Sequence, residues 1–342
     1  MVLDELFSAP PAAQPIDRHV IADGFRTETG RPETTLMFGR SLRVIVAAAG
    51  KGTRYLGDTP KVVAAGGQPV PLVVRVVSAV LPLDAQPLIV VNETTGPLVE
   101  KALREAGLEF ATTVQDPAVP GMGGAVLSAL RSFEEPPDDV LVVWADMGMV
   151  WAPNLWLSVV LHQHLHSWMS FPTKTRKDPY VSTIRDSRGQ PCDFLFRRHG
   201  DPMPPTGESD CGAFVFRADI LRELLECRAG AVREPGQEID ILPLVRDLAA
   251  AGRPRYAFHM ASDEESQGVN TLAELEKADL RYESGLNRTR NAFAAATDAA
   301  GLLEVVTQHS VQPPLVKDFC QHMARTGLKL SDLPVGLRSL CS

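Results

Sequence analysis

The chain has 342 residues, of which 44% are hydrophobic and 22% are charged, and its formal net charge is −8 at pH 7. This length can bury one large α/β core with extensions, so we expect one main domain rather than two equal ones. The acidic balance disfavours a nucleic-acid-binding surface, and the lack of an apolar run of about 18 residues disfavours a membrane span.

The beginning of the sequence has an irregular composition. Residues 1–41 contain prolines and scattered acids, without the basic start and apolar centre of a secretory signal, and are predicted to form an irregular arm. Five cysteines lie far apart and form no Cys-x-x-Cys pair, which disfavours both a disulfide framework and a thiolate zinc site. We therefore expect a cytoplasmic protein whose regular structure begins near residue 42.

From residue 42 the sequence alternates between strand-like apolar runs and helical periods. Strands are predicted at 43–49, 87–92, 108–114 and 139–145. Helices are predicted between them, at 70–81, 96–106 and 122–133. Such alternation is typical of βαβ units with right-handed crossovers. The prediction is a Rossmann-like, doubly wound α/β fold with a mixed, mostly parallel sheet, in which ligands bind beyond the carboxyl ends of the strands.

The second half of the sequence is less regular. Strands are predicted at 180–186, 193–197 and 211–216, with a polar, proline-rich loop at 198–209. Helices at 218–228, 240–251 and 271–282 are predicted around a strand at 254–260. The sequence then becomes Ala-rich and helical, so we expect a catalytic domain at 42–283 followed by a short helical C-terminal extension at 284–342.

The most informative segment follows the first predicted strand. The apolar run from Val44 to Ala49 leads into Gly50-Lys51-Gly52-Thr53-Arg54, and Pro60-Lys61 follows within one short loop. Glycines let backbone N–H groups approach phosphates closely, and fixed cations supply the charge that a triphosphate needs. The third glycine of a Rossmann motif and the Lys-Ser/Thr ending of a P-loop are both missing. The segment therefore predicts a phosphate-binding loop of another kind.

The order and spacing of these residues resemble the signature of the sugar-1-phosphate nucleotidylyltransferases, or NDP-sugar pyrophosphorylases, and within that family the uridylyltransferase domain of bacterial UDP-N-acetylglucosamine pyrophosphorylases. The resemblance covers about residues 42–283 and implies a nucleotide-diphospho-sugar transferase type of fold. It implies that Arg54 holds the β- and γ-phosphates, and that Lys61 lies between the α-phosphate and the incoming acceptor phosphate. It also implies nucleotide contacts from Ala48, Ala49, Gly50, Lys51, Gly52 and Thr53.

The resemblance continues in the segment that would bracket the nucleobase. Gln115 and the run Gly121-Met122-Gly123-Gly124 resemble the family's glutamine and its Gly-Thr-x-x-Ala-Val segment. A side-chain amide can both donate to and accept from a base edge, and glycines at a helix start leave room for the ring. Met122 replaces the usual threonine and removes a hydroxyl, so the identity of the base is open. Gln115, Gly121 and Met122 are the expected base contacts.

Two oxygen-bearing side chains are candidates for a metal site. Asp146 ends the apolar strand at 139–145, and Asn270 precedes the helix at 271–282. Each of them could instead cap a helix, since Asp and Asn are both favoured at that position. The resemblance implies that this pair binds Mg²⁺, which needs few protein oxygens beside phosphates and water. We therefore expect Mg²⁺ as the cofactor.

The acceptor region matches the family least. Glu208 and Asp210 resemble the family's Glu-x-Asn-x-Gly strand, with Asp210 in place of the asparagine that contacts the sugar. Val181 stands where the family has a glycine, and Arg197 lies near the position of a further glutamate. These departures predict an acceptor other than N-acetylglucosamine 1-phosphate. The expected acceptor contacts are Trp144, Tyr180, Val181, Arg197, Glu208 and Asp210.

Together the motifs predict a nucleotidyltransferase. An acceptor phosphate oxygen would attack the α-phosphorus of an NTP in line and release pyrophosphate, with Mg²⁺, Arg54 and Lys61 neutralising charge. The acceptor would be a sugar 1-phosphate or a sugar-like cyclitol phosphate. Alternatives are a cytidylyltransferase acting on a phosphonate or a phosphocholine-like acceptor, and a non-catalytic nucleotide-binding homologue. The expected partners are the NTP and the acceptor, with no nucleic acid or membrane, and a homodimer is an open alternative.

Overall fold

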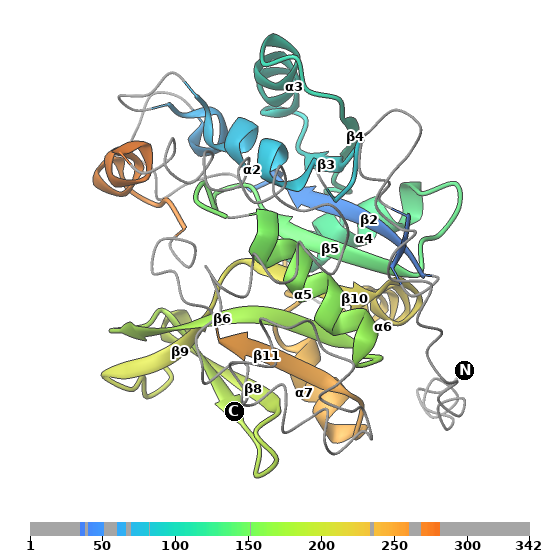
Figure 1. Ribbon diagram of the computed structural model, residues 1–342, viewed down its shortest axis with the longest axis vertical. Helices are drawn as coiled ribbons and strands as arrows, with labels where there is room; N and C mark the ends of the chain where they lie inside the picture. Colours follow the sequence, from blue (N-terminus) through green and yellow to red (C-terminus); the bar gives the residue numbers. More distant parts are fainter. Residues whose placement is uncertain are drawn as a thin grey trace, which may run out of the picture.

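One sheet organises the described part of the chain, which comprises residues 35–37, 40–50, 60–65, 70–81, 83–150, 152–232, 236–259 and 268–280 of this computed structural model. Its nine strands in these residues are β1 (Thr35–Met37), β2 (Arg40–Ala47), β3 (Leu88–Val91), β4 (Ala111–Val114), β5 (Asp139–Trp144), β6 (Met169–Lys177), β9 (Thr206–Asp210), β10 (Ala213–Arg217) and β11 (Arg255–His259). The main order is β11-β6-β10-β5-β2-β3-β4, with β1 paired to β2 and β9 paired to β6. Figure 1 shows this sheet running through the middle of the molecule.

Most pairings along the main order are parallel. They are β11 with β6, β5 with β2, β2 with β3, and β3 with β4. Strand β10 runs antiparallel to both of its neighbours, β5 and β6. The expected mixed, mostly parallel sheet is therefore confirmed. Because β2 and β5 point the same way, Ala47 and Trp144 lie side by side at their carboxyl ends, which is where this kind of sheet binds ligands.

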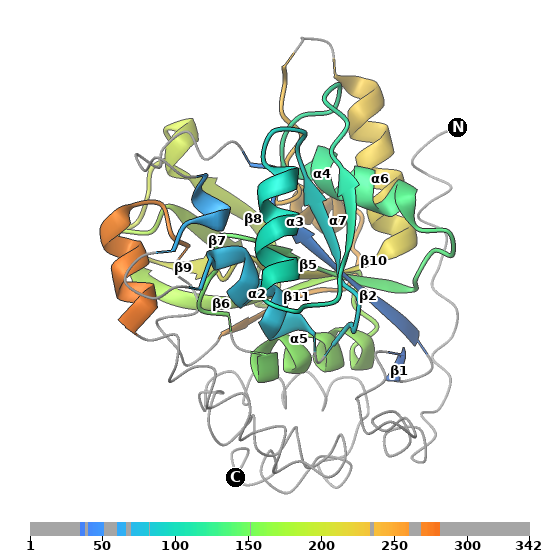
Figure 2. The ribbon, with the colours of Figure 1, turned by 90° about the horizontal axis from the view of Figure 1, so that it is seen from above.

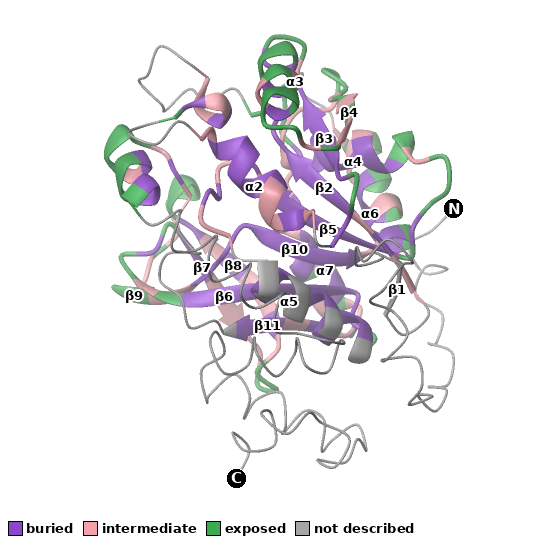
Figure 3. Ribbon diagram, turned by 45° about the horizontal axis from the view of Figure 1, so that its top comes forward, coloured by how far each residue is buried: buried purple, intermediate pink, exposed green. Residues whose placement is uncertain are grey.

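Helices cover both faces of the sheet. Buried side chains of α2 (Leu72–Val80), α3 (Gly96–Glu105) and α5 (Ala152–His164) form a core on one face, and those of α4 (Met122–Ser132), α6 (Ala218–Ala231) and α7 (Leu244–Ala250) form a core on the other. In Figure 2, α5 lies on one side of the sheet, and α4 and α6 lie on the opposite side. Val44 and Val46 pack into the first core and Ile45 into the second, so β2 is buried at successive positions (Figure 3).

A hairpin of β7 (Val181–Arg185) and β8 (Pro191–Phe196) forms a separate two-stranded sheet. It is joined to the second core by aromatic contacts. The ring centroid of Phe194 lies 5.4 Å from that of Phe171 on β6, and Phe171 lies 5.4 Å from Phe214 on β10. The 3-10 helix η3 (Arg197–His199) follows the hairpin.

Three expectations for the second half are wrong in their bounds. The strand predicted at 211–216 begins two residues later, at Ala213 of β10, because the chain turns at Gly212 with φ +64° after β9 ends at Asp210. The loop predicted at 198–209 contains η3 and most of β9. Likewise the helix predicted at 240–251 begins only at Leu244, after Pro243. An apolar run alone does not show where a glycine turn divides it.

Two elements of the middle region were not predicted at all. Helix α5 buries polar as well as apolar side chains, including Asn154, Ser158 and His162, so its sequence does not separate into a polar and an apolar face. Strand β6 follows it directly. At the two ends of the chain, β1 and the start of β2 lie inside the predicted arm, while residues 1–34 and 281–342 are outside the described residues. None of the described helices combines the length and apolar character that crossing a membrane requires.

Candidate active site

Three side chains from distant parts of the sequence meet beyond the carboxyl end of β5. Lys61 Nζ lies 2.5 Å from Asp146 Oδ2 and 3.3 Å from Asn270 Oδ1. Lys61 begins the 3-10 helix η2 (Lys61–Val63), Asp146 follows β5, and Asn270 precedes a helix at 272–280. The side chains of Lys61 and Asp146 keep only 13% and 23% of their surface exposed. The structure thus brings the predicted lysine together with both candidate metal ligands.

Asp146 presents a carboxylate that suits a divalent cation. Its Oδ1 is buried and accepts no hydrogen bond from the described residues, whereas its Oδ2 is paired with Lys61. Its carbonyl oxygen accepts a hydrogen bond from the Val269 N–H at 2.9 Å, which holds Asn270 nearby. A carboxylate beside an amide oxygen is a hard donor set of the kind that Mg²⁺ prefers. These residues fit the ion, and no group of three His, Cys, Asp or Glu side chains in the described ranges offers an alternative metal site.

The side chain of Asn270 does not cap the helix that follows it. Thr271 takes that role: its hydroxyl accepts a hydrogen bond from the Glu274 N–H at 3.2 Å, and Glu274 Oε2 accepts one from the Thr271 N–H at 3.0 Å. Glu274 Oε2 also accepts a bond from the Asn270 N–H at 2.7 Å. This reciprocal capping box leaves the Asn270 amide oxygen to face Lys61. The Thr-x-x-Glu spacing is visible in the sequence and could have separated the two interpretations of Asn270.

The backbone after β2 is tied to the neighbouring strand. The Ala48 N–H donates to Val90 O at 2.8 Å, and Asn92 Nδ2 donates to Ala49 O at 2.9 Å. A Cβ added at Gly50 would meet none of the described atoms within 4 Å. Asn92 was not singled out in the sequence. The other loop predictions, Lys51, Gly52, Thr53 and Arg54, lie outside the described residues.

The predicted base-binding segment is held in a tight turn. Gln115 Nε2 donates to Val119 O at 3.0 Å and to Gly121 O at 2.9 Å. Because both amide protons are committed to the turn, Oε1 is the group of Gln115 that can bond to a base. Gly121, with φ +91°, packs so closely on Ile239 that an added Cβ would lie 2.5 Å from the Ile239 carbonyl oxygen. Met122 begins α4 directly after this turn.

Asp210 is the predicted acceptor contact with the most unusual environment. Its side chain is buried, and its Oδ1 accepts a hydrogen bond from the Gly212 N–H at 2.9 Å. Burial raises the pKa of the Asp210 carboxyl to about 6. Repulsion from Asp240 and Asp146 also raises this pKa, and the hydrogen bond from the Gly212 N–H lowers it. The backbone N–H of Trp144 donates to Gly212 O at 3.0 Å, so Trp144 and Asp210 flank the same turn. Asp210 therefore lies within the electrostatic reach of Asp146.

The remaining predicted acceptor contacts are engaged elsewhere or exposed. Glu208 accepts hydrogen bonds from Thr173 and from Arg185, whose Nε donates at 2.7 Å. Arg197 forms an ion pair with Asp178, which is 81% exposed at its side chain. Val181 packs into the second core, and Tyr180 is 46% exposed. The hydrogen-bonded cluster of Lys61, Asp146 and Asn270 therefore does not include these four side chains.

Comparison with known proteins gives sequence relatives over most of the described region. The profile of the MobA-like NTP transferase domain matches residues 44–231. Bifunctional protein GlmU of Anaeromyxobacter sp. strain K is 31% identical over 246 residues, which is 70% of this chain and 49% of that protein. Bifunctional protein GlmU of Kineococcus radiotolerans is 32% identical over 265 residues, which is 75% of this chain and 52% of that protein. The chain thus spans about half the length of these curated relatives.

Solved structures share the fold at lower identity. The inositol-1-phosphate CTP transferase from T. maritima aligns with a TM-score of 0.55 and 17% identity, over 72% of this chain and 96% of that one. A 4-diphosphocytidyl-2C-methyl-D-erythritol synthase from Anaerococcus prevotii aligns with a TM-score of 0.50 and 11% identity, over 73% of this chain and 100% of that one. The expected resemblance and the Rossmann-like fold class are confirmed. The chain is a nucleotidyltransferase, and it belongs to the family of the MobA-like NTP transferase domain.

Proposed function

We propose that this enzyme joins the NMP unit of an NTP to a sugar 1-phosphate or a sugar-like cyclitol phosphate and releases pyrophosphate. The proposal is carried by the meeting of Lys61 with Asp146 and Asn270. One cation and two hard oxygen donors in a single cluster are what a metal-bound triphosphate needs. The shared fold with an inositol-1-phosphate CTP transferase supports including cyclitol phosphates among the acceptors.

In the proposed reaction an oxygen of the acceptor phosphate attacks the α-phosphorus of the NTP. The bond between that phosphorus and the oxygen bridging to the β-phosphate breaks, and pyrophosphate leaves with its electron pair. No general base is needed, because a phosphate monoester is already ionised near pH 7. Lys61 would leave Asp146 for the α-phosphate and stabilise the charge that builds there, and Arg54 would hold the β- and γ-phosphates.

The proposed metal ligands are Asp146 and Asn270. Bound Mg²⁺ would act as a Lewis acid that offsets the charge of the phosphates. Asp146 Oδ1, which accepts no hydrogen bond from the described residues, is the oxygen ready to bind it, whereas Oδ2 must first be released by Lys61. Asn270 would contribute its amide oxygen, and its place in the cluster rests on the Val269 bond to Asp146 O.

A second candidate acceptor follows from Asp210. Asp210 is a buried carboxylate, and above its pKa of about 6 its charge would pair with a cationic head group more favourably than with a neutral polyol. A CTP-dependent enzyme acting on a phosphocholine-like acceptor is therefore the alternative. Hydroxyl groups of a sugar or cyclitol could instead donate hydrogen bonds to Asp210.

Pyrophosphate release tests the proposal. We would measure it for each of the four NTPs with Mg²⁺ and a panel of acceptors: glucose 1-phosphate, N-acetylglucosamine 1-phosphate, inositol 1-phosphate, a phosphonate and phosphocholine. We expect the highest kcat/KM for one NTP with a sugar or cyclitol phosphate. A preference for phosphocholine would favour the alternative, and no release with any pair would contradict the proposal. Light scattering of the same preparation would show whether the enzyme, which we propose to be cytoplasmic, forms a homodimer.

A further inference from the structure

We propose that the buried ion pair between Arg75 and Asp279 positions Asn270 against Asp146 and thereby sets the affinity of the site for its divalent cation. The inference rests on the proposed function, because it concerns the same two ligands. Arg75 lies on α2, and Asp279 lies near the end of the helix at 272–280 that follows Asn270. Both are positioning residues, since they act on the metal through Asn270.

The ion pair connects three segments around the site. Arg75 and Asp279 are 2% and 4% exposed, and an Arg75 terminal nitrogen donates to Asp279 Oδ1. Arg75 Nε donates to Val70 O at 2.9 Å, and a Cβ added at Gly148 would lie 3.7 Å from Arg75 Cδ. Arg75 therefore lies beside the loop that follows Asp146 while it holds the helix at 272–280. Breaking a buried pair is costly because it leaves an uncompensated charge in a medium of low dielectric constant.

A small hydrophobic core completes the attachment. It contains Ala64, Leu72, Val269, Leu275 and Ala278, and Met149 packs against it. Ala64 follows Lys61, Met149 follows Asp146, and Leu72 lies on α2 with Arg75. The other three residues belong to the segment of Asn270. None of residues 268–280 belongs to either of the two large cores. In Figures 1 and 2 this helix, drawn orange, lies at the side of the molecule, away from the centre of the sheet. Among the contacts of the described residues, the small core and the ion pair hold the body of this helix, and the Val269 N–H bond to Asp146 O holds the segment before it.

The beginning of the helix transmits that position to Asn270. The capping box of Thr271 and Glu274 fixes the first turn, and Glu274 Oε2 also holds the Asn270 N–H. Loosening the far end of the helix would let the Asn270 amide move away from Asp146, while Asp146 keeps its place after β5. Residues that support metal ligands typically change metal affinity by about 10- to 100-fold when they are replaced. We expect a loss of about tenfold, at the low end of that range.

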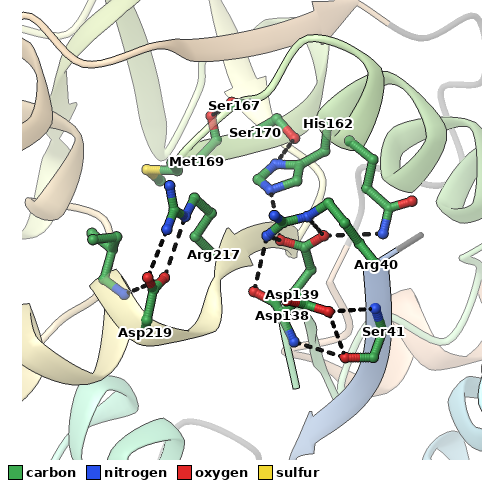
Figure 4. Close-up of polar contacts among 12 residues, drawn as sticks. Arg40, Ser41, Asp138, Asp139, His162, Ser167, Met169, Ser170, Arg217 and Asp219 are labelled. Atoms are coloured by element: carbon green, nitrogen blue, oxygen red, sulfur yellow. Dashed lines mark hydrogen bonds and ion pairs between the residues drawn. The ribbon is translucent and has the colours of Figure 1, made fainter. Parts of the chain in front are cut away.

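The test uses the full chain with Asp279→Asn, which removes one charge and keeps the size of the side chain. Arg75→Lys is the second variant, because a lysine can keep the ion pair but lacks the Nε–H that donates to Val70 O. The control is Asp139→Asn, which removes the charge of another buried carboxylate, paired with Arg40 at 2.7 Å. Figure 4 shows Asp139 between Arg40 and His162. Asp139 begins β5, at the opposite end of that strand from Asp146.

Two readouts separate positioning from general stability. Hydrogen exchange reports whether residues 268–280 loosen. Titration with Tb³⁺ alone reports the affinity of the site for a cation. Tb³⁺ binds oxygen ligands, and its luminescence is excited through a nearby tryptophan. Trp144 lies two residues before Asp146. We expect Asp279→Asn to speed exchange at 268–280 and to weaken Tb³⁺ binding about tenfold. Arg75→Lys should have a smaller effect, and Asp139→Asn should lower the Tm without either change.

The outcomes distinguish this inference from the proposed function. The Tb³⁺ luminescence that is lost in Asn270→Ala identifies the part of the signal that comes from the site. If Asn270→Ala weakens binding but Asp279→Asn does not, the positioning role is overturned and the proposed metal ligands stand. The same holds if Asp139→Asn weakens binding as much as Asp279→Asn. If no Tb³⁺ binding depends on Asn270, the proposed metal pair is wrong and the inference fails with it.

Discussion

Lys61 Nζ lies 2.5 Å from Asp146 Oδ2, so an ammonium group neutralises the carboxylate that is proposed to bind a metal. The same nitrogen lies 3.3 Å from Asn270 Oδ1, the other proposed ligand. One lysine thus engages both proposed ligands. A bound triphosphate would compete for that lysine and release Asp146. Metal binding and nucleotide binding are therefore expected to strengthen each other.

Lys61→Met tests this competition. Without the ammonium, no cation of the described residues is paired with Asp146. Mn²⁺ should therefore bind about tenfold more tightly in the absence of added nucleotide, a modest share of what a unit charge at this distance is worth. Turnover should fall by about 10²- to 10³-fold, because the charge that stabilises the transition state is lost. Mn²⁺ affinity is measured by electron paramagnetic resonance, and turnover by pyrophosphate release. The control is Lys101→Met, at a side chain that is 70% exposed, which should change neither Mn²⁺ affinity nor turnover. Equal Mn²⁺ affinity in Lys61→Met and wild type would refute the competition.

Asn270 and Thr271 are adjacent residues whose roles should separate. Asn270→Ala is expected to weaken Mn²⁺ binding at least tenfold with little change in Tm, since its side chain caps no helix. Thr271→Ala is expected to cost about 1 kcal/mol of stability, as the loss of an N-cap does, and to weaken Mn²⁺ binding less than Asn270→Ala does, because Glu274 Oε2 still holds the Asn270 N–H. Thermal unfolding and Mn²⁺ titration of both variants check this. If both variants lose stability equally, Asn270 shares the capping role and its assignment as a ligand is wrong.

The sequence predicted the sheet well where strands are buried on both faces. Val44 to Val46 are apolar at successive positions because each side of β2 contacts a core, and a pattern of that kind is easy to identify. Helix α5 escaped prediction because His162 and Ser158 are buried within it and satisfied by bonds to Ser170 Oγ and Asn154 O. The Asn154 carbonyl lies one turn back in the same helix, but Ser170 lies on β6, and a partner of that kind comes from tertiary structure, which no local pattern contains.

The site was predicted in part for a similar reason. Lys61, Asp146 and Asn270 each carry a local signal, a motif residue or a polar residue at the end of an element, and the structure brings them together. Arg75 and Asp279 carry no such signal, because a charged residue in a predicted helix is usually solvent-exposed. Their ion pair links positions that are 204 residues apart in the sequence. Only the folded chain could identify them.

Gly124 should be the least replaceable glycine of the base-binding turn. A Cβ there would lie 1.7 Å from Val119 O, the same carbonyl that Gln115 binds. Gly124→Ala is therefore expected to displace the turn and to cost about 3 kcal/mol or more, as overpacking against backbone does. Gly230→Ala on α6 is the matched control, since a Cβ there meets nothing within 4 Å and alanine favours a helix by about 0.5 to 1 kcal/mol. Urea unfolding and nucleotide titration check both, and retained NTP affinity in a destabilised Gly124→Ala would remove this turn from the binding site.

Asp210→Asn should stabilise the chain in a pH-dependent way. The pKa of Asp210 is raised to about 6 in the folded chain, above its value of about 3.9 in an unfolded one, so its ionisation disfavours folding. This cost is absent below about pH 4, grows as the pH rises through the interval to about 6, and is complete above it. Asparagine keeps an oxygen for the Gly212 N–H but cannot ionise.

The expected gain in the free energy of unfolding is therefore about 2 to 3 kcal/mol at pH 8 and close to zero at pH 4. Urea denaturation without added metal, at pH 4, 6 and 8, measures it. Asp178→Asn is the control, because that carboxylate is exposed and its loss should give no such pH-dependent gain. An equal gain at all three pH values would show that the Asp210 carboxylate is not held in a low-dielectric environment. In that case its pKa, and with it the argument for a negative acceptor pocket, would have to be abandoned, because both depend on burial of the same charge.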